Sequence, residues 1–451
     1  MLLALTLRIF GLDAKSVFAD ESASFRFAQL DWTGFWNTIT SREANMALYY
    51  IVMRFWIRIS SAVWFVRLFS ALAAVATVPV VFFLGRRLFS AEAALFGSAL
   101  LALNSFHILY SQAARGYTLA VLLVTLCSLY FIRALEEADW HPAGAYVVSA
   151  TAALYAHFFA AFVLLAQLFS LFFLKSQSRN VRRQIGLMLL VAGLGTPLAA
   201  FGALHKTDPV FWLDHPSIRD VHHLFTYFFG SGLKFGLSAL SIILAAKEWW
   251  RRASSSTQRA YESAWVYVFV GLWLAVPVAL TLLISHWRPV FSPRFLMICL
   301  PAVVLLVGEG LSSVKPPIAR YGFAAVLFTS AIMALPSYYR RPGLEDWRGV
   351  ADYLTKNVQP SDVIVVDVYY RDAFDIGFRQ SQQNCPTQKV MPLLPGRNVL
   401  KDVHRIWIVS CHPTRKAHDE VPATPRDFFL HSKANFVGIE VLRFEKSPAV
   451  K

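Results

Sequence analysis

The sequence predicts an all-α polytopic membrane domain followed by a small α/β domain, and three observations lead to this fold class. Of 451 residues, 56% are hydrophobic and only 16% are charged, and the mean hydropathy is +0.47. Apolar runs long enough to cross a bilayer as helices, about 20 residues each, recur along the first three quarters of the chain. Beyond about residue 340 a polar helical pattern and short β-rich segments take over.

The membrane part begins with MLLALTLRIFGL, which is apolar but too short to cross alone. We expect either a first helix that begins deep in the bilayer or a true start that lies upstream. The stretch has no basic n-region and no small-residue cleavage site, so we do not interpret it as a cleaved signal peptide. The spans that follow are expected at 62–84, 91–111, 117–135, 184–204, 222–246, 262–284, 294–311 and 319–338.

The run 143–174 is too long for one crossing. We expect two short helices that meet near His157, because a histidine is costly in hydrocarbon but tolerated at a helix turn that faces a cavity. The total is then about 11 transmembrane helices.

The tail, residues 339–451, is expected to form a separate domain. EDWRGVADYLTKNVQPSD is typical of a helix closed by a proline turn, and VIVVDVYY, HRIWIVS and FVGIEVLRF are typical of short strands. Cys385 and Cys411 fall in this domain. Their spacing leaves open whether they form a disulfide or remain two thiols.

Lys and Arg are distributed unequally between alternate loops. One set of loops holds Arg86, Arg87, Lys175, Arg179, Arg182, Arg183, Lys247, Arg251, Arg252, Arg259, Lys315 and Arg320, and the other holds only Arg115, Lys206, Arg219 and Arg288. The richer set is expected to be cytoplasmic. The sequence therefore predicts a multi-pass protein of the cytoplasmic (inner) membrane, with the first loop, about 13–61, and the tail outside the cytoplasm. The net charge of +15 suits such loops, and no nucleic-acid-binding module is found.

Polar side chains gather where the chain is expected to reach the outer boundary. The stretch SVFADESASFRF carries the adjacent carboxylates Asp20 and Glu21. Acids of this kind can serve as bases, and cations at the same boundary can bind an anionic group such as a phosphate. The other candidates are Arg42, Glu43, Arg115, His157 and Arg294.

Each candidate also has a plainer interpretation. Asp20 suits the N-cap of an interfacial helix, with Glu21 favourable in its first turn. Arg115 and Arg294 suit anchors to lipid headgroups, and His157 suits a packing position.

Some function classes have no support in the sequence. There is no glycine-rich phosphate loop, no CxxC pair and no HExxH motif, which argues against nucleotide hydrolysis, structural zinc and zinc-protease chemistry. The expected spans are nearly free of acids, with Glu309 the main exception, which argues against ion-coupled transport.

Seven stretches occur in a specific order: VFADESAS, EANMALYYIVMRFW, VRLFSALAAVATVPVVFFLGRRLF, LNSFHILYSQAARGYTLA, LYAHFFAAFVLLAQ, SPRFLMICLPAVVLLVGEGL and EDWRGVADYL. This order resembles bacterial GT-C glycosyltransferases, most of all the branch related to protein O-mannosyltransferases and aminoarabinose transferases. The resemblance implies a GT-C-like enzyme that transfers a sugar from a polyprenyl phosphate carrier to a protein, lipid or glycan acceptor outside the cytoplasm. It also implies that Asp20 and Glu21 form the catalytic signature.

The resemblance assigns further residues. Glu43 matches a second acid of the same loop, and Arg294 matches an arginine that opens a late span and suits the lipid phosphate. Arg42, Arg115, Tyr117 and His157 complete the expected substrate-binding set. A divalent metal between acid and phosphate occurs in this superfamily, and Asp20 and Glu43 are the candidate ligands here. One departure is the stretch SQAAR, where relatives commonly read SQEAR, so that Ala113 replaces an expected carboxylate.

The chemistry of such a transfer is consistent with these residue types. A sugar on a lipid phosphate already has a good leaving group, so the enzyme must deprotonate an acceptor hydroxyl and stabilise the departing phosphate. We expect Asp20 to be the general base and Glu21 to support the loop, because adjacent side chains on a helix diverge by about 100°. Two alternatives stay open: a transporter or flippase of lipid-linked glycans, which would not need Asp20, and a membrane sensor whose outer tail binds a ligand.

The loop charges generate a prediction about topology. A reporter that is active only outside the cytoplasm should be active when fused after Lys451, and a cytoplasmic reporter at the same site should be silent. The reverse pattern would contradict the expected number of spans.

Overall fold

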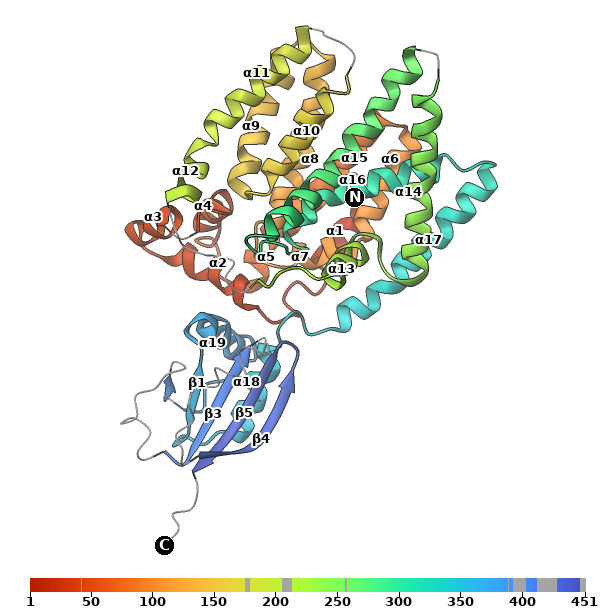
Figure 1. Cartoon of the computed structure of the whole chain (residues 1–451). Coiled ribbons are helices and arrows are strands. Elements are labelled where there is room, and N and C mark those ends of the chain that lie inside the picture. Colours follow the sequence, from red (N-terminus) through yellow and green to blue (C-terminus); the bar gives the residue numbers. More distant parts are fainter. Residues whose placement is uncertain are drawn as a thin grey trace. The chain divides into compact units, whose positions relative to one another are not determined.

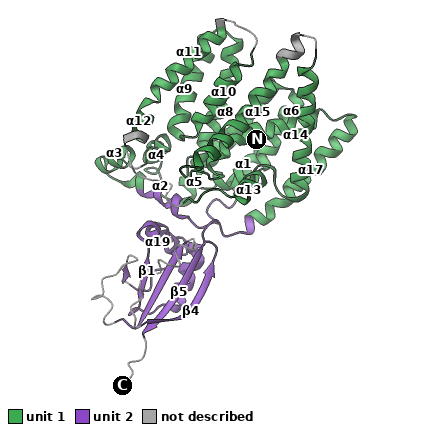
Figure 2. Cartoon of the chain, viewed as in Figure 1, with its two compact units in different colours: residues 1–10, 27–338 green, residues 11–26, 339–451 purple. Residues whose placement is uncertain are grey.

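The computed structural model describes residues 1–41, 43–174, 179–204, 213–255, 258–387, 389–391, 403–411 and 428–446. The chain divides into two compact units, coloured separately in Figure 2. Unit 1 comprises residues 1–10 and 27–338, and unit 2 comprises residues 11–26 and 339–451. The short segment 11–26 thus groups with the tail, and the division passes through α2 (Ala19–Gln29).

The described part of unit 1 is helical throughout (Figure 1). The helices, in order, are α1 (Leu2–Ile9), α3 (Trp32–Ser41), α4 (Ala47–Trp56), α5 (Val63–Leu88), α6 (Ala91–Leu103), α7 (Ser105–Ser111), α8 (Tyr117–Glu136), α9 (Trp140–Ala156), α10 (Ala160–Leu171), α11 (Arg179–Leu194), α12 (Thr196–Leu204), α13 (Ile218–Phe229), α14 (Gly232–Ala253), α15 (Gln258–Ser285), the 3-10 helix η1 (Phe295–Cys299), α16 (Leu300–Ser312) and α17 (Pro317–Arg340).

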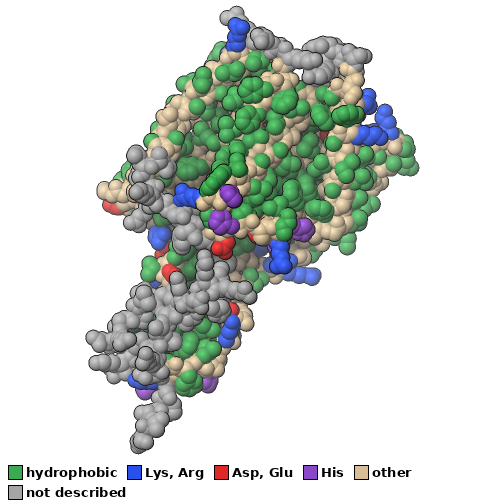
Figure 3. All heavy atoms as spheres, in the orientation of Figure 1, with side chains coloured by type: hydrophobic (Ala, Val, Ile, Leu, Met, Phe, Trp, Pro, Cys, Tyr) green, Lys and Arg blue, Asp and Glu red, His purple; other side chains and the backbone are tan. Residues whose placement is uncertain are grey.

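Five helical segments of the described residues are long and apolar enough to cross a membrane, or up to seven if each of two bent pairs counts as one span. The outer face of unit 1 is largely hydrophobic in the view of Figure 3, and side chains such as Leu189 and Ile243 are mostly exposed. An apolar surface of this kind suits lipid rather than water. The chain is therefore a polytopic membrane protein, as predicted, while the total of about 11 spans stays a prediction.

Several expected spans are broken helices. The break expected near His157 is confirmed, since α9 ends at Ala156 and α10 begins at Ala160. The segments 91–111 and 222–246 were expected to be single spans, but α6 and α7 meet at 56° and α13 and α14 at 83°. Asn104 ends α6 and caps α7, its side-chain oxygen accepting the His107 amide at 2.9 Å. Gly230 follows α13 with a φ of +86°, which favours glycine.

The short first helix is held by a buried arginine. Arg8 is fully buried and donates to the carbonyl oxygens of Leu101 and Ala102 at 3.2 and 3.1 Å, where α6 ends. Its guanidinium also lies 2.8 Å from Nδ1 of His107. Because the last carbonyls of a helix lack the usual partner four residues on, Arg8 supplies donors to them at the α6 break.

Unit 2 is a five-stranded sheet with helices on one face (Figure 1). Its elements are α18 (Trp347–Asn357), β1 (Val363–Val366), η2 (Val368–Tyr370), α19 (Arg371–Gln380), β2 (Val390–Met391), β3 (Arg405–Cys411), β4 (Phe428–Phe436) and β5 (Ile439–Lys446). The strand order is β2-β1-β3-β5-β4, with β1 parallel to both neighbours and β5 antiparallel to both of its own. All four residues of β1 are buried, as expected of a parallel strand covered on both faces.

Two of the expected strands need correction. The second half of VIVVDVYY is not a strand but the 3-10 helix η2. Asp367 caps this helix, since its side-chain oxygen accepts a hydrogen bond from the Tyr369 amide at 2.8 Å. FVGIEVLRF is a strand only from Ile439 onward, in β5; Phe436 ends β4, and Gly438, at a φ of +72°, turns the chain between the two strands. Cys385 and Cys411 are not joined by a disulfide in the structure.

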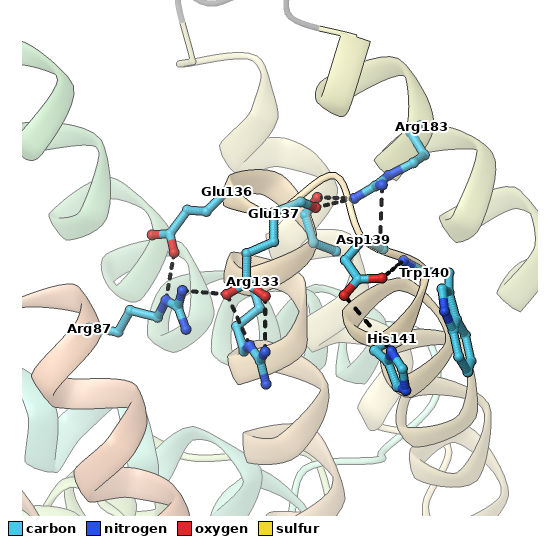
Figure 4. A network of polar contacts seen from close by, with 9 residues as sticks. Arg87, Arg133, Glu136, Glu137, Asp139, Trp140, His141 and Arg183 are labelled. Atoms are coloured by element: carbon cyan, nitrogen blue, oxygen red, sulfur yellow. Dashed lines mark hydrogen bonds and ion pairs between the residues drawn. The ribbon is translucent and has the colours of Figure 1, made fainter.

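One end of unit 1 is tied together by ion pairs (Figure 4). Arg87 of α5 contacts Glu136 and Glu137 at 2.5 Å each. Arg183 of α11 donates to the carbonyl oxygens of Ala134 and Glu137, both at 2.6 Å. Two arginines from separate Lys- and Arg-rich loops therefore lie at the same end of the helices, as an alternating topology requires.

Close helix packing depends on three glycines. A methyl group at Gly310 of α16 would overlap the backbone oxygen of Ser241 in α14, and one at Gly308 would overlap the Ala93 oxygen in α6. A methyl group at Gly97 of α6 would lie 2.8 Å from the Val304 oxygen. Small residues of this kind let helix backbones approach in a membrane.

We predict that Gly310→Ala separates α14 from α16 and lowers the free energy of unfolding by about 1–3 kcal/mol. Gly322→Ala in α17 is the matched control, because a methyl group there meets nothing within 4 Å. It should be neutral or stabilising by up to about 1 kcal/mol. Thermal unfolding in detergent measures both, and equal stability of the two variants would contradict the packing argument.

Candidate functional site

The acid pair lies at the start of α2. The amide of Ser22 donates to the Phe18 carbonyl at 2.9 Å, which makes Phe18 the N-cap and places Asp20 and Glu21 inside the first turn. The N-cap interpretation of Asp20 is therefore wrong. Asp20 is partly exposed, whereas Glu21 is fully buried. The two adjacent carboxylates thus occupy different environments, as their divergence on a helix predicts.

Contacts within unit 2 hold this acid segment. The Tyr369 hydroxyl donates to Oδ1 of Asp20 at 2.9 Å. The amide of Ala19 donates to Oε2 of Glu345 at 2.9 Å, and Arg26 forms an ion pair with Asp372 at 3.3 Å. The backbone and side chain of the acid segment are therefore oriented by residues of the tail.

A second group of predicted residues meets in unit 1. We call Arg115, Tyr117, His157, Arg294 and Phe295 the arginine–aromatic cluster. The Tyr117 ring lies 5.9 Å from His157 and 6.3 Å from Phe295, and His157 lies 5.3 Å from Phe295. The guanidinium of Arg115 lies 5.7 Å from the Tyr117 ring, and that of Arg294 lies 5.5 Å from the Phe295 ring. Two positive charges thus flank one aromatic group.

The elements that supply the cluster explain how it forms. Arg115 and Tyr117 stand at the beginning of α8, His157 follows the end of α9, and Arg294 precedes η1. These are the helix ends opposite to the contacts of Figure 4, in which Arg87 at the end of α5 and Arg183 near the beginning of α11 both reach the end of α8. The cluster therefore lies at the other end of the helices, where the sequence expects the poorer set of cationic loops.

Arg115 is oriented by neighbouring polar groups. Its guanidinium donates to the hydroxyl of Tyr50 in α4 at 2.9 Å, and its carbonyl accepts from Ser70 in α5 at 3.1 Å. Tyr50 is fully buried. A half-buried arginine fixed in this way fits an anion-binding role better than a mobile headgroup anchor.

The break at His157 is stabilised from the first loop. The Phe158 amide donates to the side-chain oxygen of Asn45 at 3.0 Å, and the Phe159 amide donates to Nδ1 of His157 at 3.2 Å. Glu43 lies two residues before Asn45, and its amide donates to Thr38 at 2.9 Å. The loop that carries Glu43 therefore reaches the turn that carries His157.

Two almost fully buried side chains of the cluster each have a polar atom without a hydrogen-bond partner among the described residues. The atoms are the Tyr117 hydroxyl and Nε2 of His157, and the two residues are 2% and 1% exposed. An unsatisfied buried polar group costs about 1–3 kcal/mol. Such groups beside two guanidinium charges can be satisfied by the oxygens of an anionic ligand.

The structure does not bear on every predicted residue. Arg42 lies outside the described residues. Ala113, at the position of the expected carboxylate, is buried between α7 and α8. Within the described ranges no three His, Cys, Asp or Glu side chains come together to hold a metal ion.

Sequence reasoning did not assign Asn45, Tyr50, Phe295 or Tyr369 to the site. Asn45 and Tyr50 were visible as polar groups in the apolar stretch EANMALYY. Tyr369 is 349 residues from Asp20, and no local pattern connects them.

Comparison with known proteins adds the family context. The family model for dolichyl-phosphate-mannose-protein mannosyltransferases matches residues 45–199, which include Arg115, Tyr117 and His157. No curated protein matches the chain.

Solved structures match over nearly the whole chain. ArnT from Cupriavidus metallidurans bound to undecaprenyl phosphate is 13% identical, with a TM-score of 0.57, and the match covers 98% of this chain and 96% of ArnT. The apo state of ArnT matches with the same coverage and identity and a TM-score of 0.60. The oligosaccharyltransferase AglB from Archaeoglobus fulgidus, in complex with an inhibitory peptide and a dolichol phosphate, is 11% identical, with a TM-score of 0.54, over 98% of this chain and 73% of AglB. The resemblance expected from the seven stretches is confirmed, and the chain has the fold of the GT-C glycosyltransferases.

Proposed function

We propose that this protein is a membrane glycosyltransferase that moves a sugar from a polyprenyl phosphate donor to a protein, lipid or glycan acceptor outside the cytoplasm. Residues 1–338 form the catalytic membrane domain in this proposal, and residues 339–451 form a small extracytoplasmic domain. The fold shared with ArnT and AglB supports it, since both of those structures contain a polyprenyl-type phosphate. The transferred sugar is a hexose or a pentose.

The arginine–aromatic cluster is the observation that carries the proposal. Arg115 and Arg294 supply two positive charges, and the Tyr117 hydroxyl and His157 Nε2 supply buried polar atoms without partners among the described residues. A phosphate on a lipid carrier needs this combination, because its charge grows as the sugar leaves. Aromatic rings beside the phosphate suit the apolar chain of the carrier.

The proposed reaction is a displacement at the anomeric carbon of the sugar. Asp20 accepts the proton of the acceptor hydroxyl, the hydroxyl oxygen bonds to the anomeric carbon, and the bond from that carbon to the phosphate oxygen breaks. Arg294 and Arg115 stabilise the negative charge that the leaving phosphate gains. Glu43 orients the acceptor, and Glu21, buried beside Asp20, supports the helix turn. Arg42 contributes to substrate binding.

Charge distribution supports the expected location. The richer set of Lys and Arg includes Arg87 and Arg183, which meet at one end of unit 1, opposite the arginine–aromatic cluster. A cytoplasmic position of that end would put the cluster on the outer side of the inner membrane, together with the tail.

The remaining alternatives differ in their need for Asp20. A flippase of lipid-linked glycans would use the same phosphate contacts without any base. A membrane sensor would place its specificity in the tail. Only the transferase requires a proton acceptor, so a single variant separates it from both.

We predict that Asp20→Asn lowers turnover by about 10²–10⁴-fold at equal folded amounts of protein. Asparagine keeps the size of the side chain but cannot accept the proton. Transfer of labelled sugar from a polyprenyl phosphate donor by purified protein is the measurement. Turnover close to that of the wild type would exclude Asp20 as the base.

The unpartnered hydroxyl of Tyr117 gives a second test. We predict that Tyr117→Phe leaves the free energy of unfolding unchanged or raises it by about 1 kcal/mol, because no protein hydrogen bond among the described residues is lost. The KM for the polyprenyl phosphate donor should rise about tenfold if this hydroxyl binds the phosphate.

Tyr146→Phe is the matched control. Tyr146 is also fully buried in a membrane helix, but its hydroxyl donates to Gln167 at 3.0 Å. This variant should lose about 1 kcal/mol of stability and keep the wild-type KM. If Tyr117→Phe is instead destabilised and keeps its KM, the hydroxyl has a structural role.

A further inference from the structure

The tail of the chain makes a direct contact with the acid that we propose as the base. The Tyr369 hydroxyl and Oδ1 of Asp20 are 2.9 Å apart, and both residues belong to unit 2. The hydroxyl is the donor, because a carboxylate can only accept. A hydrogen bond to an ionised acceptor is stronger than one between neutral groups.

Tyr369 is held firmly at its own position. It follows β1, the buried parallel strand between β2 and β3. The Tyr369 amide donates to Oδ1 of Asp367 at 2.8 Å, and the Tyr370 amide donates to the Asp367 carbonyl at 3.0 Å. The tyrosine therefore stands on a hydrogen-bonded turn at the carboxyl end of a parallel strand, which is where functional side chains of such sheets often lie.

The backbone around Asp20 is fixed by the same unit. Glu345, almost fully buried, accepts from the Ala19 amide at 2.9 Å and from Nε1 of Trp347 at 2.6 Å. The Val17 amide donates to the side chain of Gln380 at 3.1 Å. Residues 17–19 are thus attached to α18 and α19 before the chain enters α2. The tail therefore fixes the backbone next to Asp20. A fixed backbone positions a base accurately only if its carboxylate is oriented as well.

The environment of Tyr370 indicates where the negative charge lies. Burial, followed by the neighbouring groups Cys411, Glu345, Asp367 and Asp20, raises the pKa of Tyr370. Several acids therefore surround this turn, and their negative charges disfavour an ionised Asp20 carboxylate. A hydroxyl that donates to Asp20 offsets part of this effect.

We propose that Tyr369 is a positioning residue that orients the Asp20 carboxylate for proton abstraction. This role rests on the transferase function proposed above. The hydroxyl donates to Oδ1, which restricts the orientation of the carboxylate, and it stabilises the ionised form on which the base depends. The outer domain then takes part in the reaction through one hydrogen bond.

The test is Tyr369→Phe in the full-length protein, with labelled sugar transfer measured across a range of pH. We expect kcat to fall about tenfold, which corresponds to the loss of one hydrogen bond to a charged group. The acidic limb of the rate profile should move to higher pH, because the carboxylate loses a donor that favours its ionised form. The KM for the polyprenyl phosphate donor should not change.

Tyr353→Phe is the matched control. Tyr353 lies in α18 of the same unit, and its ring packs against Trp407 at 6.1 Å and Phe436 at 5.7 Å. Removal of its hydroxyl should leave kcat and the pH profile unchanged. A loss shared by both variants would indicate general damage to unit 2 and would overturn the specific role of Tyr369.

A double variant separates this role from a direct one. In an Asp20→Asn background, Tyr369→Phe should cause no further loss, because it acts only through the Asp20 carboxylate. An active wild type with an unchanged Tyr369→Phe profile, or an additive loss in the double variant, would overturn the proposal. Absence of transfer by the wild type from hexosyl and pentosyl polyprenyl phosphate donors would reject the transferase function itself, and the role of Tyr369 with it.

Discussion

The architecture of unit 1 depends on the requirement that polar groups inside an apolar bundle find partners. A continuous helix satisfies its own backbone, so polar side chains concentrate where helices end. Asn104 caps α7, Arg8 donates hydrogen bonds to the last carbonyls of α6, and Asn45 accepts a hydrogen bond from the turn at His157. The arginine–aromatic cluster uses the same kind of position, at the beginning of α8, the end of α9 and the beginning of η1. Polar residues in a membrane protein therefore require breaks in its helices, and these breaks are also where polar side chains can contact a ligand.

The second unit adds a different kind of support. The acid segment precedes most of the membrane helices in sequence, yet its contacts within unit 2 are with residues more than 300 positions later. A small sheet with helices on one face is rigid enough to hold a carboxylate, which a loop of similar length would not be. The shared fold with ArnT extends over almost the whole of both chains, including the tail.

Much of the fold was predictable because it follows from local physical rules. Long apolar runs became long helices, and the histidine in 143–174 correctly marked a break. The misassigned elements, 91–111, 222–246, VIVVDVYY and FVGIEVLRF, share one cause. In each, a single asparagine, glycine or aspartate overrides the preference of its apolar neighbours, and a hydropathy average hides it. Of the arginine–aromatic cluster, Arg115, Tyr117, His157 and Arg294 were identified in advance as candidates, since charge and polarity stand out in such an apolar sequence.

The sequence by itself determined that the chain spans a membrane, that a small α/β unit follows, and which polar residues are unusual enough to carry function. Composition and periodicity suffice for these conclusions, because burial in lipid acts on every residue independently. Only the tertiary structure decided that Tyr50 fixes Arg115, that Phe295 packs beside Tyr117 and His157, and that Tyr369 contacts Asp20. Those pairings depend on which helix ends and strand ends meet in space. The free energy that selects them is spread over hundreds of packing contacts, and no short stretch of sequence contains it.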